Sequence, residues 1–347
     1  MKRLENVLTT VVGGLQQLLS TSTRSVRKPL GVSILAVSLG LSAVSVQAQS
    51  LTVYSAGPNR LIANLARDFQ AETGTRVEVF QGTTGQILAR LEAERANPVA
   101  DVLISASWDS AEALKEAGDL LAYTPAGAEQ VPDSLRDSHY IAQGVAALAL
   151  VWNSRSDTPK PTDWSDLARA EYRNEVTMPD PAQSGAAFEL LTGLLTALGE
   201  EPTWDLMQSL RANGMVVPGP NARALNPVLQ GAKSAVFGAV DYIALGQRAN
   251  GEAIEVIFPT SGTVLAPRPM MILSYSRQPD QAKAFLDFML SEQGQQRVAE
   301  AYLMPARSDV EGLRPSLSAL NVIDVDSAEM TAQREQILRR FRQVMSQ

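Results

Sequence analysis

Short β-branched segments alternate with amphipathic segments in the chain after residue 50. Residues 51–55, 77–80 and 101–105 have the composition of strands. Each is followed by a segment with apolar residues at helical spacing, and the first of these ends at Gly74. A regular succession of strand, turn and helix predicts an α/β fold with a parallel sheet and crossover helices. In such sheets ligands bind in the loops that follow the strands.

Two long apolar segments, residues 146–153 and 264–274, bracket a second set of strand and helix patterns. This arrangement predicts two lobes joined by two crossover strands, which would act as a hinge around a ligand cleft. We expect lobe 1 to comprise residues 49–150 plus 268–347, and lobe 2 to comprise residues 151–267. The amphipathic C-terminal segment is expected to dock on lobe 1, with a partner-binding face as the alternative.

The first 48 residues are typical of a secretory signal peptide. Arg24, Arg27 and Lys28 precede the apolar segment 29–41, and small residues end the pattern at Ala48. The alternative is a membrane anchor, but the apolar run is broken by Ser and Gly, and a span needs about 20 residues. We therefore expect cleavage after Ala48 and a periplasmic protein. The chain has no Cys, which excludes disulfides and a lipid-modified cysteine.

The charge balance argues against nucleic acid as a partner. Residues 1–48 contain five of the 30 bases and one of the 37 acids, so the rest has 25 bases, 36 acids and a net charge of −11. An acidic surface repels phosphate backbones. A local site can still bind a small anionic solute, and we expect a monomer.

Catalytic patterns are missing from the sequence. His139 is the only His, no Cys is present, and no Gly-x-Ser-x-Gly elbow occurs. Zinc sites need clusters of His and Cys. We therefore expect neither an enzyme nor a resident cofactor or metal; an exported enzyme stays the disfavoured alternative.

Five loops before predicted helices are rich in small and polar residues: residues 55–58, 82–85, 105–107, 183–186 and 220–222. A helix start has unpaired N–H groups and partial positive charge, so it can bind an anion that approaches closely over Gly or Ala. The alternative at each loop is a side chain that caps its own helix. In "PDPAQSGAAFELLTGLL", residues 179–195, the helix start looks uncapped. The candidate ligand-binding residues are Ser55, Ala56, Thr83, Thr84, Ser107, Ser184, Gly185, Ala186, Asn221, Asp241 and Tyr242.

The segments "LTVYSAGP", "FQAETGTRVEVFQGTTG", "ADVLISAS", "DWSDLARAEYRNEVTMPDPAQSGAAFELL" and "AKAFLDFMLSEQGQ" together resemble the bacterial extracellular solute-binding proteins of ABC importers. The resemblance covers roughly residues 50–310 and is greatest to the ferric-ion-binding-like branch. That branch includes binders of hexose phosphates, phosphoglycerate and 2-aminoethylphosphonate. The resemblance implies the two-lobed type II periplasmic-binding-protein fold and delivery of a solute to an inner-membrane ABC permease.

The resemblance also bears on the ligand. Ferric binders of this branch use a His, a Glu and two adjacent Tyr, whose places here look occupied by Pro58, Ala106, Asp241 and Tyr242, so three of the four iron ligands are absent. A hard ferric ion requires several anionic oxygen ligands, and one Tyr and one Asp supply few of them.

The anion-binding pattern of that branch is retained. Its Ser-Gly-Ala helix start and a later Asn match residues 184–186 and Asn221. The resemblance thus implies an organophosphate, a sugar phosphate or a phosphonate as ligand. Asp241 is hypothesised to pair with an amino group of an aminophosphonate, with a helix cap as the alternative. The alternative functions are ferric iron binding with an exogenous anion and a periplasmic ligand-sensing subunit of a membrane receptor.

Overall fold

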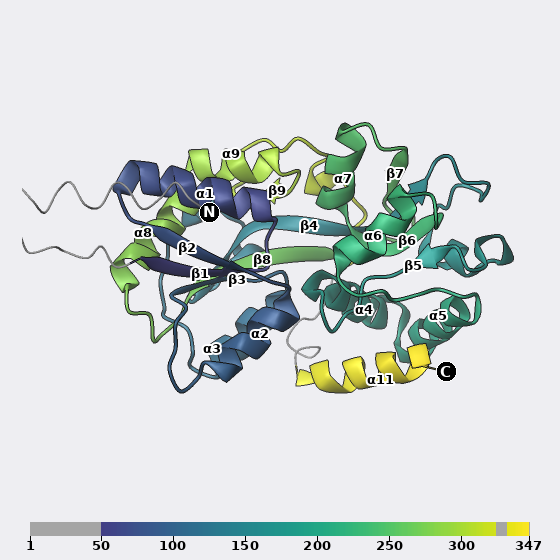
Figure 1. Ribbon diagram of the computed structural model, residues 1–347, viewed down its shortest axis with the longest axis horizontal. Coiled ribbons are helices and arrows are strands. Elements are labelled where there is room, and N and C mark those ends of the chain that lie inside the picture. Colours follow the sequence, from purple (N-terminus) through teal and green to yellow (C-terminus); the bar gives the residue numbers. More distant parts are fainter. Residues whose placement is uncertain (1–49, 324–331, 347) are drawn as a thin grey trace, which may run out of the picture. The chain divides into compact units, whose positions relative to one another are not determined.

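The computed structural model describes residues 50–323 and 332–346 (Figure 1). The predicted signal peptide, residues 1–48, lies outside the described residues. Within the described ranges, no helix combines the length and apolar character that crossing a membrane requires.

The strands in the described ranges are β1 (Leu51–Ser55), β2 (Val77–Gln81), β3 (Val102–Ile104), β4 (Tyr140–Asn153), β5 (Val176–Thr177), β6 (Ala235–Val240), β7 (Ile254–Ile257), β8 (Leu265–Ile272) and β9 (Met304–Pro305). The α-helices there are α1 (Asn59–Thr73), α2 (Thr84–Ala93), α3 (Trp108–Glu116), α4 (Gly185–Leu198), α5 (Glu200–Ala212), α6 (Asn221–Leu229), α7 (Asp241–Ala249), α8 (Pro279–Leu290), α9 (Glu292–Glu300) and α11 (Arg334–Ser346). The strands form one mixed sheet in the order β2-β1-β3-β8-β4-β6-β5, with β7 and β9 paired to β4.

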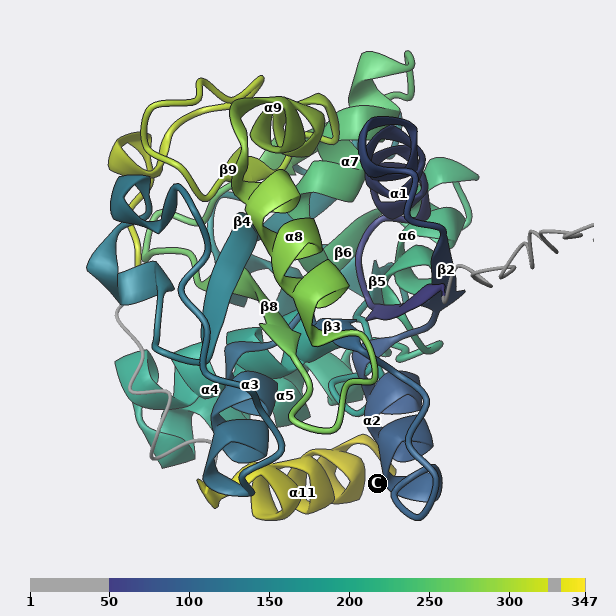
Figure 2. The same cartoon turned by 90° about the vertical axis from the view of Figure 1, so that its left-hand side faces the viewer.

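Strands β1, β2 and β3 pair in parallel, as the alternating pattern predicts. Helices cover both faces of these strands (Figures 1 and 2). Because successive side chains of a strand point to opposite faces, Leu51 and Val53 join the core that includes α1 and α8, whereas Tyr54 joins the core that includes α2 and α3. Strand β3, which lies between β1 and β8, is accordingly apolar and buried throughout, whereas the edge strand β2 has an exposed Glu78.

Strand β4 links the two predicted lobes. Its residues 140–147 pair antiparallel with β8, and residues 148–152 pair antiparallel with β6. Strand β8 in turn pairs with β3, so the two long strands lie in the middle of the sheet. The sequence predicts the first of these strands from residue 146; it begins earlier, at Tyr140. Gly144 lies in this added part, where a Cβ atom would come within 2.8 Å of the Met304 carbonyl oxygen.

The C-terminal helix α11 packs on α5, a helix of the predicted lobe 2. Its apolar residues Ile337, Phe341 and Val344 are buried, and the Arg211 Nε atom donates a hydrogen bond to the Met345 carbonyl oxygen at 3.0 Å. The expectation that this segment docks on lobe 1 is therefore wrong. Amphipathic periodicity identifies the buried face of a helix, but it does not identify the surface that buries it.

Candidate functional site

Helix α4 begins at the sequence for which an anion-binding role is predicted. The Ser184 Oγ atom accepts a hydrogen bond from the Ala187 N–H at 3.2 Å and lies 3.1 Å from Asn221 Oδ1, to which it donates. Ser184 therefore caps α4, and the expectation of an uncapped helix start is wrong. Within the described residues, the N–H groups of Gly185 and Ala186 have no acceptor. They lie at the positive end of the helix dipole and can bind an anion.

The loops that follow β2 and β3 approach the start of α4 closely. A Cβ atom at Gly185 would overlap the Ser107 Cβ atom and lie 2.8 Å from the Ala106 carbonyl oxygen. A Cβ atom at Gly85 would overlap the Ala182 carbonyl oxygen. Glycine occupies positions 85 and 185 because two backbones meet there. These contacts bring the ends of strands β2 and β3 next to the start of α4.

Hydroxyl groups at the ends of β1 and β2 have different partners. Ser55 Oγ accepts from the Gly57 N–H at 3.0 Å, and Thr83 Oγ1 accepts from the Gln86 N–H at 3.2 Å as the cap of α2. Both hydroxyls thus serve local structure. The Thr84 Oγ1 atom is buried and has no hydrogen-bond partner within the described residues. Leaving a buried polar group unpaired costs about 1–3 kcal/mol, which makes Thr84 the better candidate for a ligand contact.

Arg268 is a candidate site residue that the sequence analysis does not identify. It lies in β8 between Pro267 and Pro269, and only 1 % of its surface is exposed. The Nη2 atom donates to the Ala56 carbonyl oxygen at 2.6 Å, whereas the Nε atom has no partner in the described part of the chain. No carboxylate of the described residues forms an ion pair with this side chain. The signal that could have revealed it is a single charge inside an otherwise apolar strand.

The surroundings of Arg268 favour a bound anion. Removing a charge from water costs several kcal/mol unless a partner compensates it. The Tyr242 ring centroid lies 5.7 Å from the Arg268 Cζ atom. Burial raises the pKa of the Tyr242 hydroxyl, and the charge of Arg268 opposes that rise. A Cβ atom at Gly57 would lie 3.9 Å from Arg268 Nη2, so the loop after β1 borders the guanidinium as well.

Asp241 has a different partner from the one hypothesised. Its carboxylate accepts from the Ala147 N–H at 2.9 Å and the Tyr242 N–H at 2.7 Å, and forms a buried ion pair with Arg314. Burial raises the pKa of Asp241 to about 6, which the charge of Arg314 partly offsets. The Asp241 carboxylate is thus occupied by partners within the protein, and this geometry does not support an ion pair with an amino group of the ligand.

A buried group of charges adjoins the start of α3. The Trp108 N–H donates to Glu189 Oε1 at 2.7 Å, and the hydroxyl of Ser107 donates to Asp109, which also pairs with Arg334. Ser107, a predicted ligand residue, is therefore engaged by Asp109. Burial, reinforced by the charge of Asp109, raises the pKa of Glu189 to about 8. Glu189 lies inside the protein because α4 is buried along its first ten residues.

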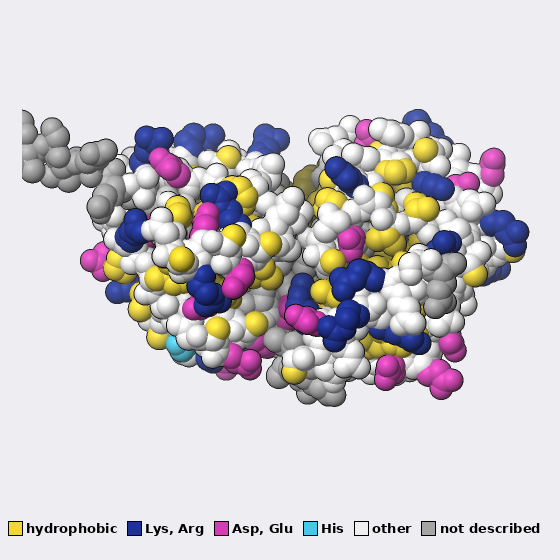
Figure 3. Space-filling view, turned by 60° about the horizontal axis from the view of Figure 1, so that its bottom comes forward, with side chains coloured by type: hydrophobic (Ala, Val, Ile, Leu, Met, Phe, Trp, Pro, Cys, Tyr) yellow, Lys and Arg dark blue, Asp and Glu magenta, His cyan; other side chains and the backbone are white. Residues whose placement is uncertain are grey.

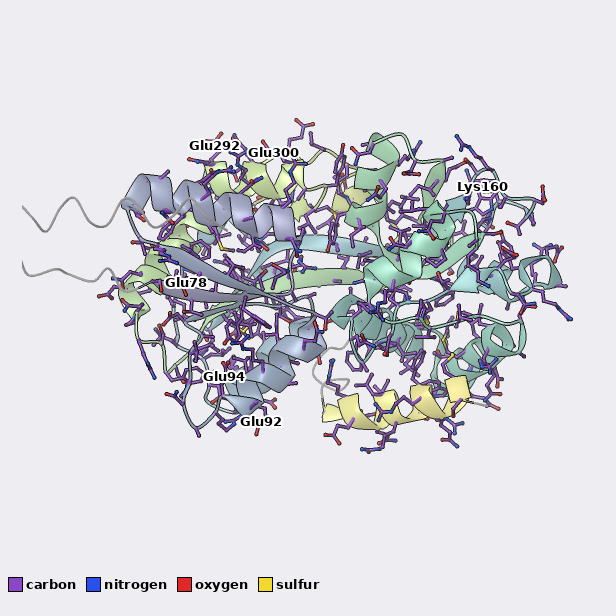
Figure 4. All side chains as sticks on the ribbon, viewed as in Figure 1. Glu78, Glu92, Glu94, Lys160, Glu292 and Glu300 are labelled. Atoms are coloured by element: carbon purple, nitrogen blue, oxygen red, sulfur yellow. The ribbon has the colours of Figure 1, made fainter. Side chains whose placement is uncertain are left out.

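The acidic groups that set the net charge lie elsewhere. Glu78, Glu92, Glu292 and Glu300, labelled in Figure 4, are exposed on β2, α2 and α9. Such surface charges are screened by water and salt, so they are compatible with a local anion site. Within the described residues, no group of three or more His, Cys, Asp or Glu side chains could hold a metal ion.

The chain is similar to known solute-binding proteins along most of its length. It is 25 % identical, over 80 % of this chain and 85 % of the relative, to a periplasmic protein of Salmonella typhi that is named for binding 2-aminoethylphosphonate. It is 24 % identical to the Fe(3+)-binding periplasmic protein of Serratia marcescens, over 76 % of this chain and 80 % of that protein. The structure of AfuA from Actinobacillus pleuropneumoniae, with fructose-6-phosphate bound, superposes with a TM-score of 0.80, 22 % identity and coverage of 86 % of this chain and 98 % of AfuA.

These likenesses confirm the expected periplasmic-binding-protein fold. The family model described as "Bacterial extracellular solute-binding protein" matches residues 97–330. Its members bind solutes and are not enzymes. The chain therefore belongs to the bacterial extracellular solute-binding proteins.

Proposed function

We propose that this chain is the periplasmic substrate-binding component of an ABC importer, and that its ligand is a small organophosphate, sugar phosphate or phosphonate. The observation that carries the proposal is the buried Arg268 guanidinium, which has an unpaired Nε atom and no carboxylate partner among the described residues. The relative named for 2-aminoethylphosphonate and the AfuA structure with fructose-6-phosphate support this ligand class. Cleavage of residues 1–48 and export to the periplasm belong to the same proposal.

In this proposal the anion is held by donors from both lobes. The Arg268 guanidinium supplies the positive charge, and the N–H groups of Gly185 and Ala186, which have no acceptor among the described residues, supply directed donors at a helix start. The Thr84 hydroxyl, which has no partner in the described part of the chain, provides a further donor. Tyr242 borders the guanidinium and would contact the organic part of the solute.

Transport follows from closure of the lobes on this ligand. Strands β4 and β8 serve as the hinge between lobe 1 and lobe 2, since both pass through the middle of the sheet. A ligand that contacts both lobes stabilises the closed form, because it binds that form more tightly than the open one. The inner-membrane permease is then the partner that recognises the closed protein.

The experiment that tests this proposal is a ligand screen of the protein without residues 1–48. Thermal unfolding is followed with inorganic phosphate, 2-aminoethylphosphonate, fructose-6-phosphate, 3-phosphoglycerate and ferric citrate. A ligand at 100 times its dissociation constant stabilises the protein by about 2.7 kcal/mol. We expect a shift with at least one phosphate or phosphonate, and calorimetry then gives its dissociation constant.

The matched variants are Arg268→Gln and, as the control, Arg60→Gln at the exposed start of α1. A hydrogen bond to a charged group contributes about 1.5–3 kcal/mol, so Arg268→Gln should weaken binding by roughly 10- to 150-fold. Arg60→Gln should bind like the wild type. A shift with ferric citrate alone, unaffected by Arg268→Gln, would refute the anion proposal and support the iron-binding alternative.

A further inference from the structure

The first residue of helix α11 contacts both predicted lobes. The Arg334 guanidinium forms an ion pair with Asp109 at the start of α3, which belongs to lobe 1. It also lies over the Phe188 ring of α4, with 4.1 Å between the Arg334 Cζ atom and the ring centroid. The Asp109 side chain is 4 % exposed and that of Arg334 is 21 % exposed. The ion pair is therefore largely shielded from water, so its attraction is screened less than that of a surface pair, while burial raises the pKa of Asp109 against the pull of Arg334.

The remainder of α11 packs on α5 of lobe 2. Ile337, Phe341 and Val344 are buried, and the Arg211 side chain binds the Met345 carbonyl oxygen near the end of the helix. Most of α11 thus lies against one lobe, whereas its first residue forms an ion pair with the other lobe. The helix therefore connects the two lobes. It also lies beyond residue 330, where the match to the family model ends.

We propose that α11 is a strap that holds the two lobes in the closed arrangement through the ion pair between Arg334 and Asp109. The proposal rests on the hinge closure of the proposed function. When the lobes separate, Arg334 would stay with Phe188 on lobe 2, whereas Asp109 would move away with lobe 1. The opening motion thus has to break this ion pair.

The location of the ion pair connects the strap to the ligand site. Asp109 accepts the hydroxyl of Ser107, and Ser107 packs against Gly185 at the start of α4. The neighbouring Trp108 N–H binds Glu189, which is also on α4. The strap therefore acts where lobe 1 meets the helix start that holds the anion, and its loss should speed up ligand release more than it slows ligand binding.

The matched variants are Arg334→Gln and Arg339→Gln. Arg339 lies on the same helix, is exposed, and pairs only with the exposed Glu335 at 3.1 Å among the described residues. Figure 3, which brings the side of the molecule that holds α11 forward, shows Lys and Arg side chains close to Asp and Glu side chains on this surface. Loss of one such exposed pair should have little effect. Arg334→Lys keeps the charge and should restore most of the wild-type behaviour.

The experiment measures the distance between the lobes directly. Because the chain has no Cys, Glu116→Cys on α3 and Gln208→Cys on α5 introduce two exposed sites for spin labels. Distance distributions are recorded by double electron–electron resonance without ligand and with inorganic phosphate. We expect Arg334→Gln to shift the population toward longer distances, and to raise the dissociation rate of phosphate about tenfold. Arg339→Gln should match the wild type.

The outcomes separate this inference from the proposed function. If Arg334→Gln lowers thermal stability but leaves the distances and the dissociation rate unchanged, Arg334 is only a structural residue and the strap is refuted. If the distances change while the wild type binds no phosphate or phosphonate, the strap stands and the anion proposal fails.

Discussion

Replacing Glu189 with Gln should remove a large part of the pH dependence of stability. Glu189 is buried in α4, and its Oε1 atom accepts the N–H of Trp108, the first residue of α3. Gln has nearly the same shape and retains the carbonyl acceptor for this hydrogen bond, but it cannot ionise. The variant therefore tests the charge of the group while leaving its packing in place.

The magnitude follows from the pKa of Glu189, which burial raises from 4.5 to about 8. Between these values the folded protein retains a proton that the unfolded chain has released. The stability of the wild type therefore falls as the pH rises through this window. At 1.36 kcal/mol per pKa unit, the loss between pH 4.5 and pH 7 is about 3 kcal/mol. Gln at this position has no such loss.

Urea unfolding of both proteins at pH 5, 6, 7 and 8 provides the measurement. All other titrating groups are shared, so the difference in unfolding free energy between variant and wild type reports the titration of Glu189 together with its effect on the neighbouring Asp109. That difference should move in favour of Glu189→Gln by about 1.4 kcal/mol for each pH unit up to the folded pKa. A difference that stays constant with pH would show that Glu189 is ionised in the folded protein, and would refute the reasoning.

Two further substitutions test the packing and the charges around the site. Gly185→Ala places a methyl group against Ser107, so it should cost about 1–3 kcal/mol of stability and weaken anion binding. Urea unfolding measures the stability, and calorimetry measures the binding. Wild-type values for both would contradict the close approach of the two backbones. Asp241→Asn leaves the buried Arg314 without its carboxylate and should cost about 3–5 kcal/mol. Its preference between 2-aminoethylphosphonate and inorganic phosphate should not change, and a loss of preference for the amine would restore a ligand role for Asp241.

The parallel arrangement of β1, β2 and β3 could be predicted from sequence because its signals are local. Each strand is a short β-branched run, and each following helix has its apolar residues at helical spacing, such as Leu61, Leu65 and Phe69 of α1. The spacing of apolar residues and the positions of turn residues involve only neighbouring positions, so they can be recognised without knowledge of the rest of the fold. Ser184 and Asn221, which belong to two of the loops predicted from this alternation, lie within hydrogen-bond distance of each other.

The roles of single charged residues could not be predicted in this way. Arg268 is buried only because β8 pairs with β3 and β4 in the middle of the sheet. Asp241 is engaged by Arg314, which lies 73 residues further along the chain. The lobe on which α11 packs likewise depends on the tertiary structure, because the helix packs against α5.

What the sequence by itself determined is the α/β alternation, the family and the loops that form the candidate site. Only the tertiary structure decided which polar groups are already paired within the protein and which are left unpaired. The physical reason is that a hydrogen bond or an ion pair depends on distances between atoms that can be far apart in the chain. Thr83 and Thr84 illustrate this difference: they are adjacent and chemically equal, yet one caps a helix and the other has a buried hydroxyl with no partner among the described residues.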